Sequence, residues 1–157
     1  MVRKFALACI LVGSFLSAAA AQTARNATPE DGFQYLSAKD AVALVNKPGP
    51  GPVLSLLSDH ENYFSEVVAR KTDGQVELHQ HWIDFMTIVS GDVTLTYGGT
   101  LAGAKETAPG ELRGGAISGG KTVVLHRGDY LEIPAGVPHL MTAPQHNFTY
   151  LIVKVRV

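Results

Sequence analysis

Residues 79–91 read HQHWIDFMTIVSG, in which two histidines stand one residue apart and an aspartate follows three residues later. The segment 75–81 has the pattern of a strand, where alternate side chains point to the same face. Glu77, His79 and His81 would therefore share a face. Imidazoles at i and i+2 of a strand lie about 6 to 7 Å apart, so both can reach one metal ion. Such pairs also occur as surface or hydrogen-bonded histidines, so further ligands are needed to support a metal site.

A second segment, GDYLEIPAGVPH at residues 128–139, predicts where another ligand comes from. Its glycines and prolines predict a strand followed by a sharp turn, which delivers His139 onto the next strand. Asp84 is also well placed, if residues 82 and 83 form a corner that brings it back beside the histidine pair.

Together the two segments resemble the cupin superfamily, whose members are small antiparallel jelly-roll barrels. The family's first motif is G-x5-H-x-H-x3,4-E-x6-G, and its second is G-x5-P-x-G-x2-H-x3-N. The first is matched by His79-Gln80-His81 with Asp84-x6-Gly91, and the second by Gly128-x5-Pro134-x-Gly136-x2-His139. The resemblance covers residues 53–157. It implies that the metal ligands are His79, His81, Asp84 and His139.

The match departs from the family pattern in three places. Asp84 stands where glutamate is usual and comes one or two residues early, so its carboxylate either reaches the ion differently or lies just outside its coordination sphere. Gly74 is one place from the expected leading glycine, and Ala143 replaces the final asparagine.

Physical chemistry supports a metal independently of the resemblance. Three imidazoles and a carboxylate are costly to bury unpaired in an apolar barrel, and a divalent cation offsets that cost. A hydrogen-bonded polar cluster without metal is the alternative. Iron, copper or manganese fit this donor set best, and zinc or nickel would also accept it.

The rest of the chain predicts an all-β, antiparallel fold with one short helix. Ser37 is a helix N-cap with Asp40 three residues on, and apolar positions continue to Val45. Short runs bounded by turn residues predict strands at 53–57, 63–70, 75–81, 84–90, 93–97, 122–125, 130–133, 139–142 and 148–157. Residues 98–120 contain eight of the 16 glycines, which favours a long loop or loose hairpin that shapes a site.

Residues 1–21 have the pattern of a signal peptide, with Arg3 and Lys4 before an apolar stretch and a small-residue end. We therefore expect a secreted or periplasmic protein with a lead-in and short helix over 22–52 and a cupin barrel over 53–157. Cleavage after Ala21 would remove the only cysteine, Cys9, and leave 11 basic and 14 acidic side chains, a formal charge of −3. The absence of a basic stripe disfavours nucleic acid and anionic membranes as partners.

For three neighbouring side chains the sequence allows more than one role. Glu77 is either a hydrogen-bond acceptor for a ligand histidine, a further ligand, or a solvated strand-end residue. Trp82 lines a substrate mouth or belongs to the core, and Tyr97 faces the cavity or packs in the core with its hydroxyl at the rim. The strand 148–157 is apolar on both faces, which indicates that both are covered. Cupins often pair through such strands, so the resemblance implies a homodimer.

Three hypotheses of function follow. The first is a metal-dependent oxidoreductase of the oxygenase or oxidase kind, acting on a small organic or carbohydrate substrate. The second is a redox-neutral isomerase, lyase or epimerase that uses the ion as a Lewis acid. The third is a non-catalytic metal- or sugar-binding protein.

Overall fold

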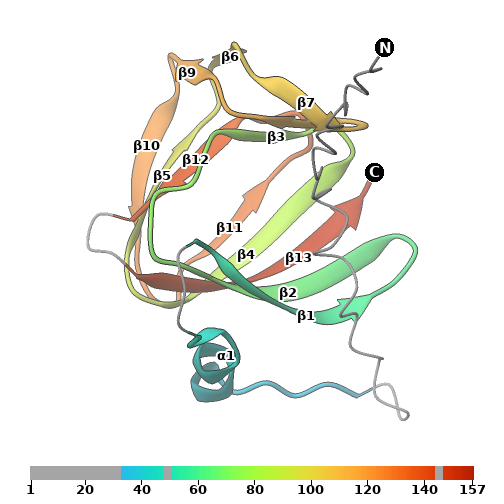
Figure 1. The fold of residues 1–157 in the computed structure, drawn as a ribbon, viewed down its shortest axis with the longest axis vertical. Coiled ribbons are helices and arrows are strands. Elements are labelled where there is room, and N and C mark those ends of the chain that lie inside the picture. The colour runs from blue at the N-terminus through green and yellow to red at the C-terminus, as the bar shows by residue number, and fades with distance from the viewer. Residues whose placement is uncertain (1–32, 48–50, 144–146) are drawn as a thin grey trace, which may run out of the picture.

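The computed structural model describes residues 33–47, 51–143 and 147–157, so the expected signal peptide at 1–21 lies outside the described residues. Two antiparallel sheets face each other and enclose a barrel, as Figure 1 shows. The five-stranded sheet has the order β1(Val53–Asp59), β2(Tyr63–Arg70), β13(Phe148–Arg156), β4(Trp82–Ser90) and β11(Tyr130–Ile133). The six-stranded sheet has the order β10(Lys121–Leu125), β5(Val93–Tyr97), β12(His139–Thr142), β3(Glu77–His79), β8(Glu111–Arg113) and β7(Lys105–Ala108). The expected mostly β, antiparallel fold with one short helix is confirmed.

The helix α1(Ala38–Val45) packs outside the five-stranded sheet, next to β1 and β2 (Figure 1). The Ser37 hydroxyl accepts the backbone N–H of Asp40 at 3.1 Å, which satisfies one free donor of the first turn. Ala41 and Val45 are buried against Val67. The helix thus covers part of the sheet's outer face, as its apolar positions require.

The inward faces of both sheets form the main core and also the walls of a cavity. In β4, Asp84, Met86 and Ile88 are buried and alternate with partly buried residues, as the sequence predicts. In β13, Phe148, Tyr150, Ile152 and Lys154 are buried on one face. Apolar residues fill one end of the barrel, whereas charged residues occupy the same faces farther along.

The glycine-rich segment is more regular than its composition predicts. Residues 98–120, expected to form a long loop or loose hairpin, contain the four short strands β6(Thr100–Ala102), β7, β8 and β9(Ala116–Ser118). β6 pairs with β9, and β7 and β8 extend the six-stranded sheet beyond β3. Glycines with positive φ at the turns, such as Gly110 at 75°, allow these tight reversals. The composition therefore reflects closely spaced turns.

The described residues include no helix long and apolar enough to cross a membrane. On the outer face of β13, Leu151 packs against the cluster formed by α1. Pairing of this face with a second copy of the chain stays a prediction.

Candidate metal centre

The candidate site is assembled across the barrel from three strands. Glu77 and His79 lie two residues apart on β3, and His139 on β12 is the strand partner of Glu77. Asp84 reaches the same point from β4 in the opposite sheet. The cluster therefore joins the two sheets, and its parts come from both cupin-like segments of the sequence.

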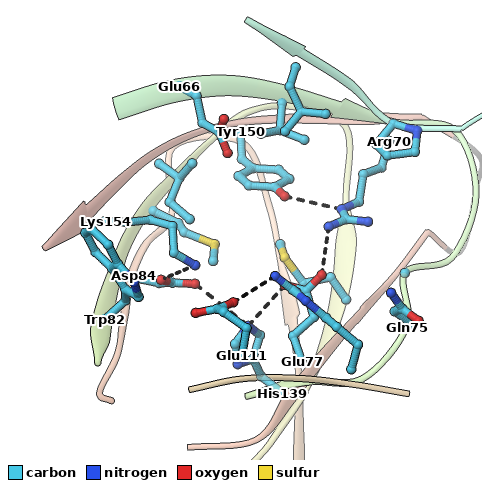
Figure 2. Close-up of a pocket in the computed structure, with 18 of the residues that line it drawn as sticks. Glu66, Arg70, Gln75, Glu77, Trp82, Asp84, Glu111, His139, Tyr150 and Lys154 are labelled. Carbon is cyan, nitrogen blue, oxygen red and sulfur yellow. Dashed lines mark hydrogen bonds and ion pairs between the residues drawn. The ribbon is translucent and has the colours of Figure 1, made fainter. Parts of the chain in front are cut away.

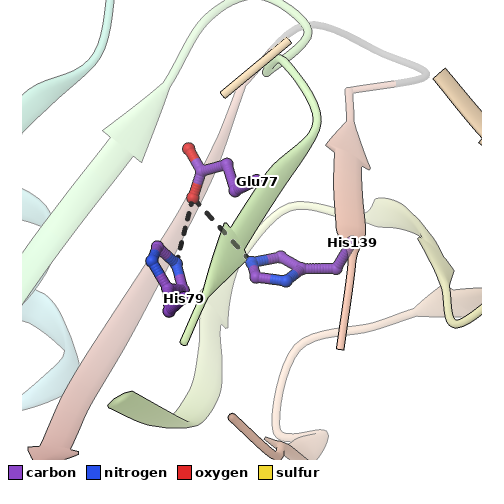
Figure 3. A group of neighbouring side chains, drawn as sticks. All are labelled: Glu77, His79 and His139. Atoms are coloured by element: carbon purple, nitrogen blue, oxygen red, sulfur yellow. Dashed lines mark ion pairs between the residues drawn. The ribbon is translucent and has the colours of Figure 1, made fainter. Parts of the chain in front are cut away.

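The donor atoms of this cluster converge closely. The ligand atoms of Glu77, His79 and His139 all lie within 4.8 Å of one another (Figure 3). Nε2 of His79 is 3.6 Å from Oε2 of Glu77 and 3.4 Å from Oδ2 of Asp84. Nε2 of His139 is 3.8 Å from each of the same two oxygens. Two imidazoles and two carboxylates thus surround one point.

Hydrogen bonds on the far side of each ring orient the imidazoles. Nδ1 of His79 lies 2.6 Å from Oε2 of Glu111, and Nδ1 of His139 lies 3.1 Å from the carbonyl oxygen of Val137. Carboxylate and carbonyl oxygens only accept hydrogen bonds, so both Nδ1 atoms carry the proton. In the neutral rings, the lone pairs therefore lie on Nε2, which faces the cluster.

The fit to a metal ion follows from buried atoms that lack partners. Nε2 of His79, Nε2 of His139 and Oδ2 of Asp84 are buried and have no hydrogen-bond partner among the described residues. Oδ1 of Asp84 makes an ion pair with Nζ of Lys154 at 2.7 Å. Leaving several polar atoms unpaired in one interior spot is costly, whereas a cation bound there would pair all three. The donor set fits a divalent transition metal.

The electrostatics of the metal-free cluster favour ionised carboxylates. Burial tends to raise the pKa values of Glu77 and Asp84, but the neighbouring histidines and cationic side chains outweigh it and hold both below their ordinary value. Burial lowers the pKa of His139. Burial also acts to lower the pKa of His79, but the carboxylates around it, with Asp84 the strongest, raise it to about 10. A metal would therefore displace a proton from His79.

His81, which the motif makes a ligand, lies outside the cluster. Strand β3 ends at His79, and the backbone bends at Gln80 and His81. The two-residue alternation stops there, so the side chain of His81 is exposed and lies against Gly110. The partner of His79 on the shared face is Glu77 instead. The corner that the sequence predicts at residues 82 and 83 lies earlier, at Gln80 and His81, because β4 already begins at Trp82.

A cavity of about 360 Å³ opens beside the cluster (Figure 2). Its walls include Trp82, Gln75 and Glu66, together with Arg70 and Lys154. Figure 2 shows Lys154 and Arg70 pointing into it from opposite sides of the cluster. Tyr97 is exposed and lines a separate groove, so of the two aromatic candidates only Trp82 borders this cavity.

Several charged residues at this site went unrecognised in the sequence. Glu111 and Arg113 come from β8, where the register places them opposite His79 and Glu77. Arg113 Nη1 lies 2.5 Å from Glu77 Oε2, and its Nη2 lies 3.1 Å from Glu111 Oε2. Arg70 contacts Glu77 at 3.3 Å.

One of the charged residues at this site, Lys154, could have been recognised from the sequence. Lys154 continues the two-residue alternation of Phe148, Tyr150 and Ile152, which marks it as a charge on a buried face. The strand β8 lies in the segment expected to be a long loop or loose hairpin, so no periodicity indicated Glu111 or Arg113.

No family model and no curated protein matches the chain. Among solved structures, a cupin superfamily protein from Desulfitobacterium hafniense aligns with a TM-score of 0.51 and 12% identity, over 73% of this chain and 85% of that one. A proposed mannose-6-phosphate isomerase from Ralstonia eutropha aligns with a TM-score of 0.53 and 16% identity, over 74% and 95%.

An oxygenase is also among the similar structures. A hydroquinone 1,2-dioxygenase solved with Cd²⁺ and 4-hydroxybenzonitrile aligns with a TM-score of 0.50 and 19% identity. The match covers 65% of this chain and 63% of that one. At these identities the likeness concerns the fold, which agrees with the jelly-roll topology and the two motif-like segments. The chain therefore has the cupin fold.

Proposed function

We propose that this protein is a metal-dependent oxidoreductase of the oxygenase or oxidase kind, acting on a small organic or carbohydrate substrate. The observation that supports it is the convergence of two histidines and a glutamate, His79, His139 and Glu77, beside an open cavity. A set of two histidines and one carboxylate with open positions is typical of non-haem iron(II) oxygenases. Iron is thus the first candidate, with manganese or copper next.

When bound, the ion would supply open coordination positions for O₂ and for a substrate that enters the cavity. The side chains and backbone of the protein orient the ligands and shape the space around the substrate. Glu111 and Val137 hold the two imidazoles in orientation through Nδ1. Lys154 forms an ion pair with Asp84 at 2.7 Å and so holds its carboxylate in place. Trp82 and the apolar wall residues limit the water around the substrate.

The decisive experiment combines elemental analysis with oxygen consumption. The protein is purified from its proposed export compartment without chelator, beside His139→Ala and, as a matched control, His126→Ala. The side chain of His126 is exposed, and its Nδ1 lies 2.9 Å from Oδ1 of Asp92, away from the barrel interior. We expect near-stoichiometric iron, manganese or copper in the wild type and the control, none in His139→Ala, and substrate-dependent oxygen uptake that follows the metal. Full metal in His139→Ala would refute the site.

A redox-neutral isomerase, lyase or epimerase is the second candidate. It is favoured by groups that can hold and move protons along the cavity. Burial raises the pKa of Glu66 above its ordinary value and that of Tyr150 to about 12, so both hold a proton more firmly than in water. Turnover that continues without oxygen and with zinc in place of iron would support this candidate over the first.

A further inference from the structure

The charges around the cavity indicate the class of its ligand. Seven carboxylate or cationic side chains line it: the carboxylates Glu66, Glu77, Asp84 and Glu111, and the cations Arg70, Arg113 and Lys154. When both imidazoles donate to an ion they are neutral, so these side chains sum to one negative charge with Glu66 ionised and to zero with Glu66 protonated. A divalent cation makes the sum positive in either state, in a space where an uncompensated charge is costly.

The cationic groups also retain unused hydrogen-bond donors. Arg70 donates through Nε to the Tyr150 hydroxyl at 3.2 Å and through Nη2 to Glu77, and Nη1 has no partner among the described residues. Lys154 uses one contact, with Asp84. The two side chains approach the cluster from opposite sides in Figure 2. An anion located over the ion would therefore meet N–H donors on both sides.

We propose that the ligand of this cavity is a small carboxylic acid, bound as the anion between Arg70 and Lys154 and next to the metal. This inference rests on the proposed metal centre and names the substrate class of that same site. The anion of an acid offsets the net positive charge of the metal-loaded cavity, whereas a neutral sugar leaves it uncompensated. The volume of about 360 Å³ is at the low end for ligand pockets, which favours a compact acid.

The protein contains its own reporter for binding. Trp82 is the only tryptophan in the sequence and lines the cavity, so its fluorescence responds to occupancy. Zinc is the appropriate ion for this measurement because it is redox-inactive and has a filled d shell. Metal content is determined first for each variant, which separates loss of the ion from loss of the ligand.

The test titrates zinc-loaded protein with glucuronate, with glucose and with pyruvate. Glucuronate and glucose share a sugar ring and differ in the carboxylate, while pyruvate represents the simple organic acids. We expect at least one acid to bind at least tenfold more tightly than glucose. Tight binding of pyruvate alone indicates a simple organic acid, and tight binding of glucuronate alone indicates an acidic sugar. Equal binding of glucose and glucuronate with weaker pyruvate binding, or no binding of either acid, overturns the proposal.

Variants then test the assigned residues. Lys154→Met and Arg70→Gln each remove one cation, and either should weaken acid binding at least tenfold while zinc is retained. Arg127→Gln removes the same charge from an exposed position and serves as the control. Glu66→Gln removes a carboxylate and should leave acid binding as tight or tighter. Unchanged acid binding in both cation variants overturns the assignment. Failure to take up zinc at all would instead refute the proposed metal centre.

Discussion

Oε2 of Glu111 lies 2.6 Å from Nδ1 of His79, so a residue of the short strand β8 determines which nitrogen of that imidazole faces the cluster. The register pairs the two residues directly across β3 and β8. The glycine-rich segment therefore belongs to the candidate metal centre, although it shares no part of the two cupin-like motifs.

Replacing Glu111 by alanine should weaken metal binding by about 10- to 100-fold, the usual loss when a ligand histidine loses its hydrogen-bond acceptor. Glu111→Gln should recover part of the loss, because its amide oxygen still accepts from Nδ1. Competition with a chelator of known affinity measures both. Glu61→Ala, at an exposed turn, is the control, and equal affinity in all three variants would exclude this role.

His79 and His81 provide a direct comparison between motif and structure. His79 is buried in the cluster, whereas His81 is exposed on the bend that follows β3. We expect His79→Ala to lose its metal and His81→Ala to keep nearly all of it, as measured by elemental analysis of the two purified proteins. Loss of metal from both would mean that His81 coordinates, as the cupin motif implies.

Asp84 and Lys154 should show strong coupling. Asp84→Ala leaves the buried ammonium of Lys154 without its partner, which typically costs about 3 to 5 kcal/mol of stability. The double variant Asp84→Ala/Lys154→Met should recover much of that loss. Urea unfolding of the wild type, both single variants and the double variant in chelator gives the coupling energy.

If the losses of unfolding free energy in the two single variants add up to the loss in the double variant, the ion pair contributes nothing to stability. Asp84→Ala should also bind metal more weakly while remaining folded. An unchanged affinity would show that Asp84 lies outside the coordination sphere, as its altered spacing in the motif allows.

The metal-free protein should lose stability between about pH 6.5 and about pH 10. The folded-state pKa of His79 is raised to about 10 from an ordinary value of 6.5. A group with a raised folded-state pKa stabilises the fold fully below its unfolded-state pKa and loses that contribution as the pH rises through the folded-state value. Urea unfolding in chelator at about pH 6 and about pH 9.5 measures the decrease.

In His79→Gln that part of the pH dependence should disappear, because the proton-binding group is gone. Other groups that titrate at about pH 10 are present in both the wild type and His79→Gln. The informative quantity is therefore the difference between the pH profiles of their unfolding free energies. Identical profiles would contradict the assignment of this pH dependence to His79.

Local patterns in the sequence determined the architecture and part of the candidate site. Period-two alternation placed Asp84, Met86 and Ile88 on one buried face, the Ser37 cap located the helix, and the turn at Gly136 delivered His139 to the start of β12. These features depend on neighbouring residues, whose geometry the backbone periodicities dictate.

Only the tertiary structure decided the membership of the cluster. The alternation placed Glu77, His79 and His81 on one face, which assumes that the strand continues, but β3 ends at His79, so of the other two residues only Glu77 stays in the cluster with His79. Glu111, Arg113 and Lys154 reach the site through strand register and sheet closure, which bring together residues far apart in the chain. Such contacts depend on where strands end and pair, and no local pattern of residues specifies that.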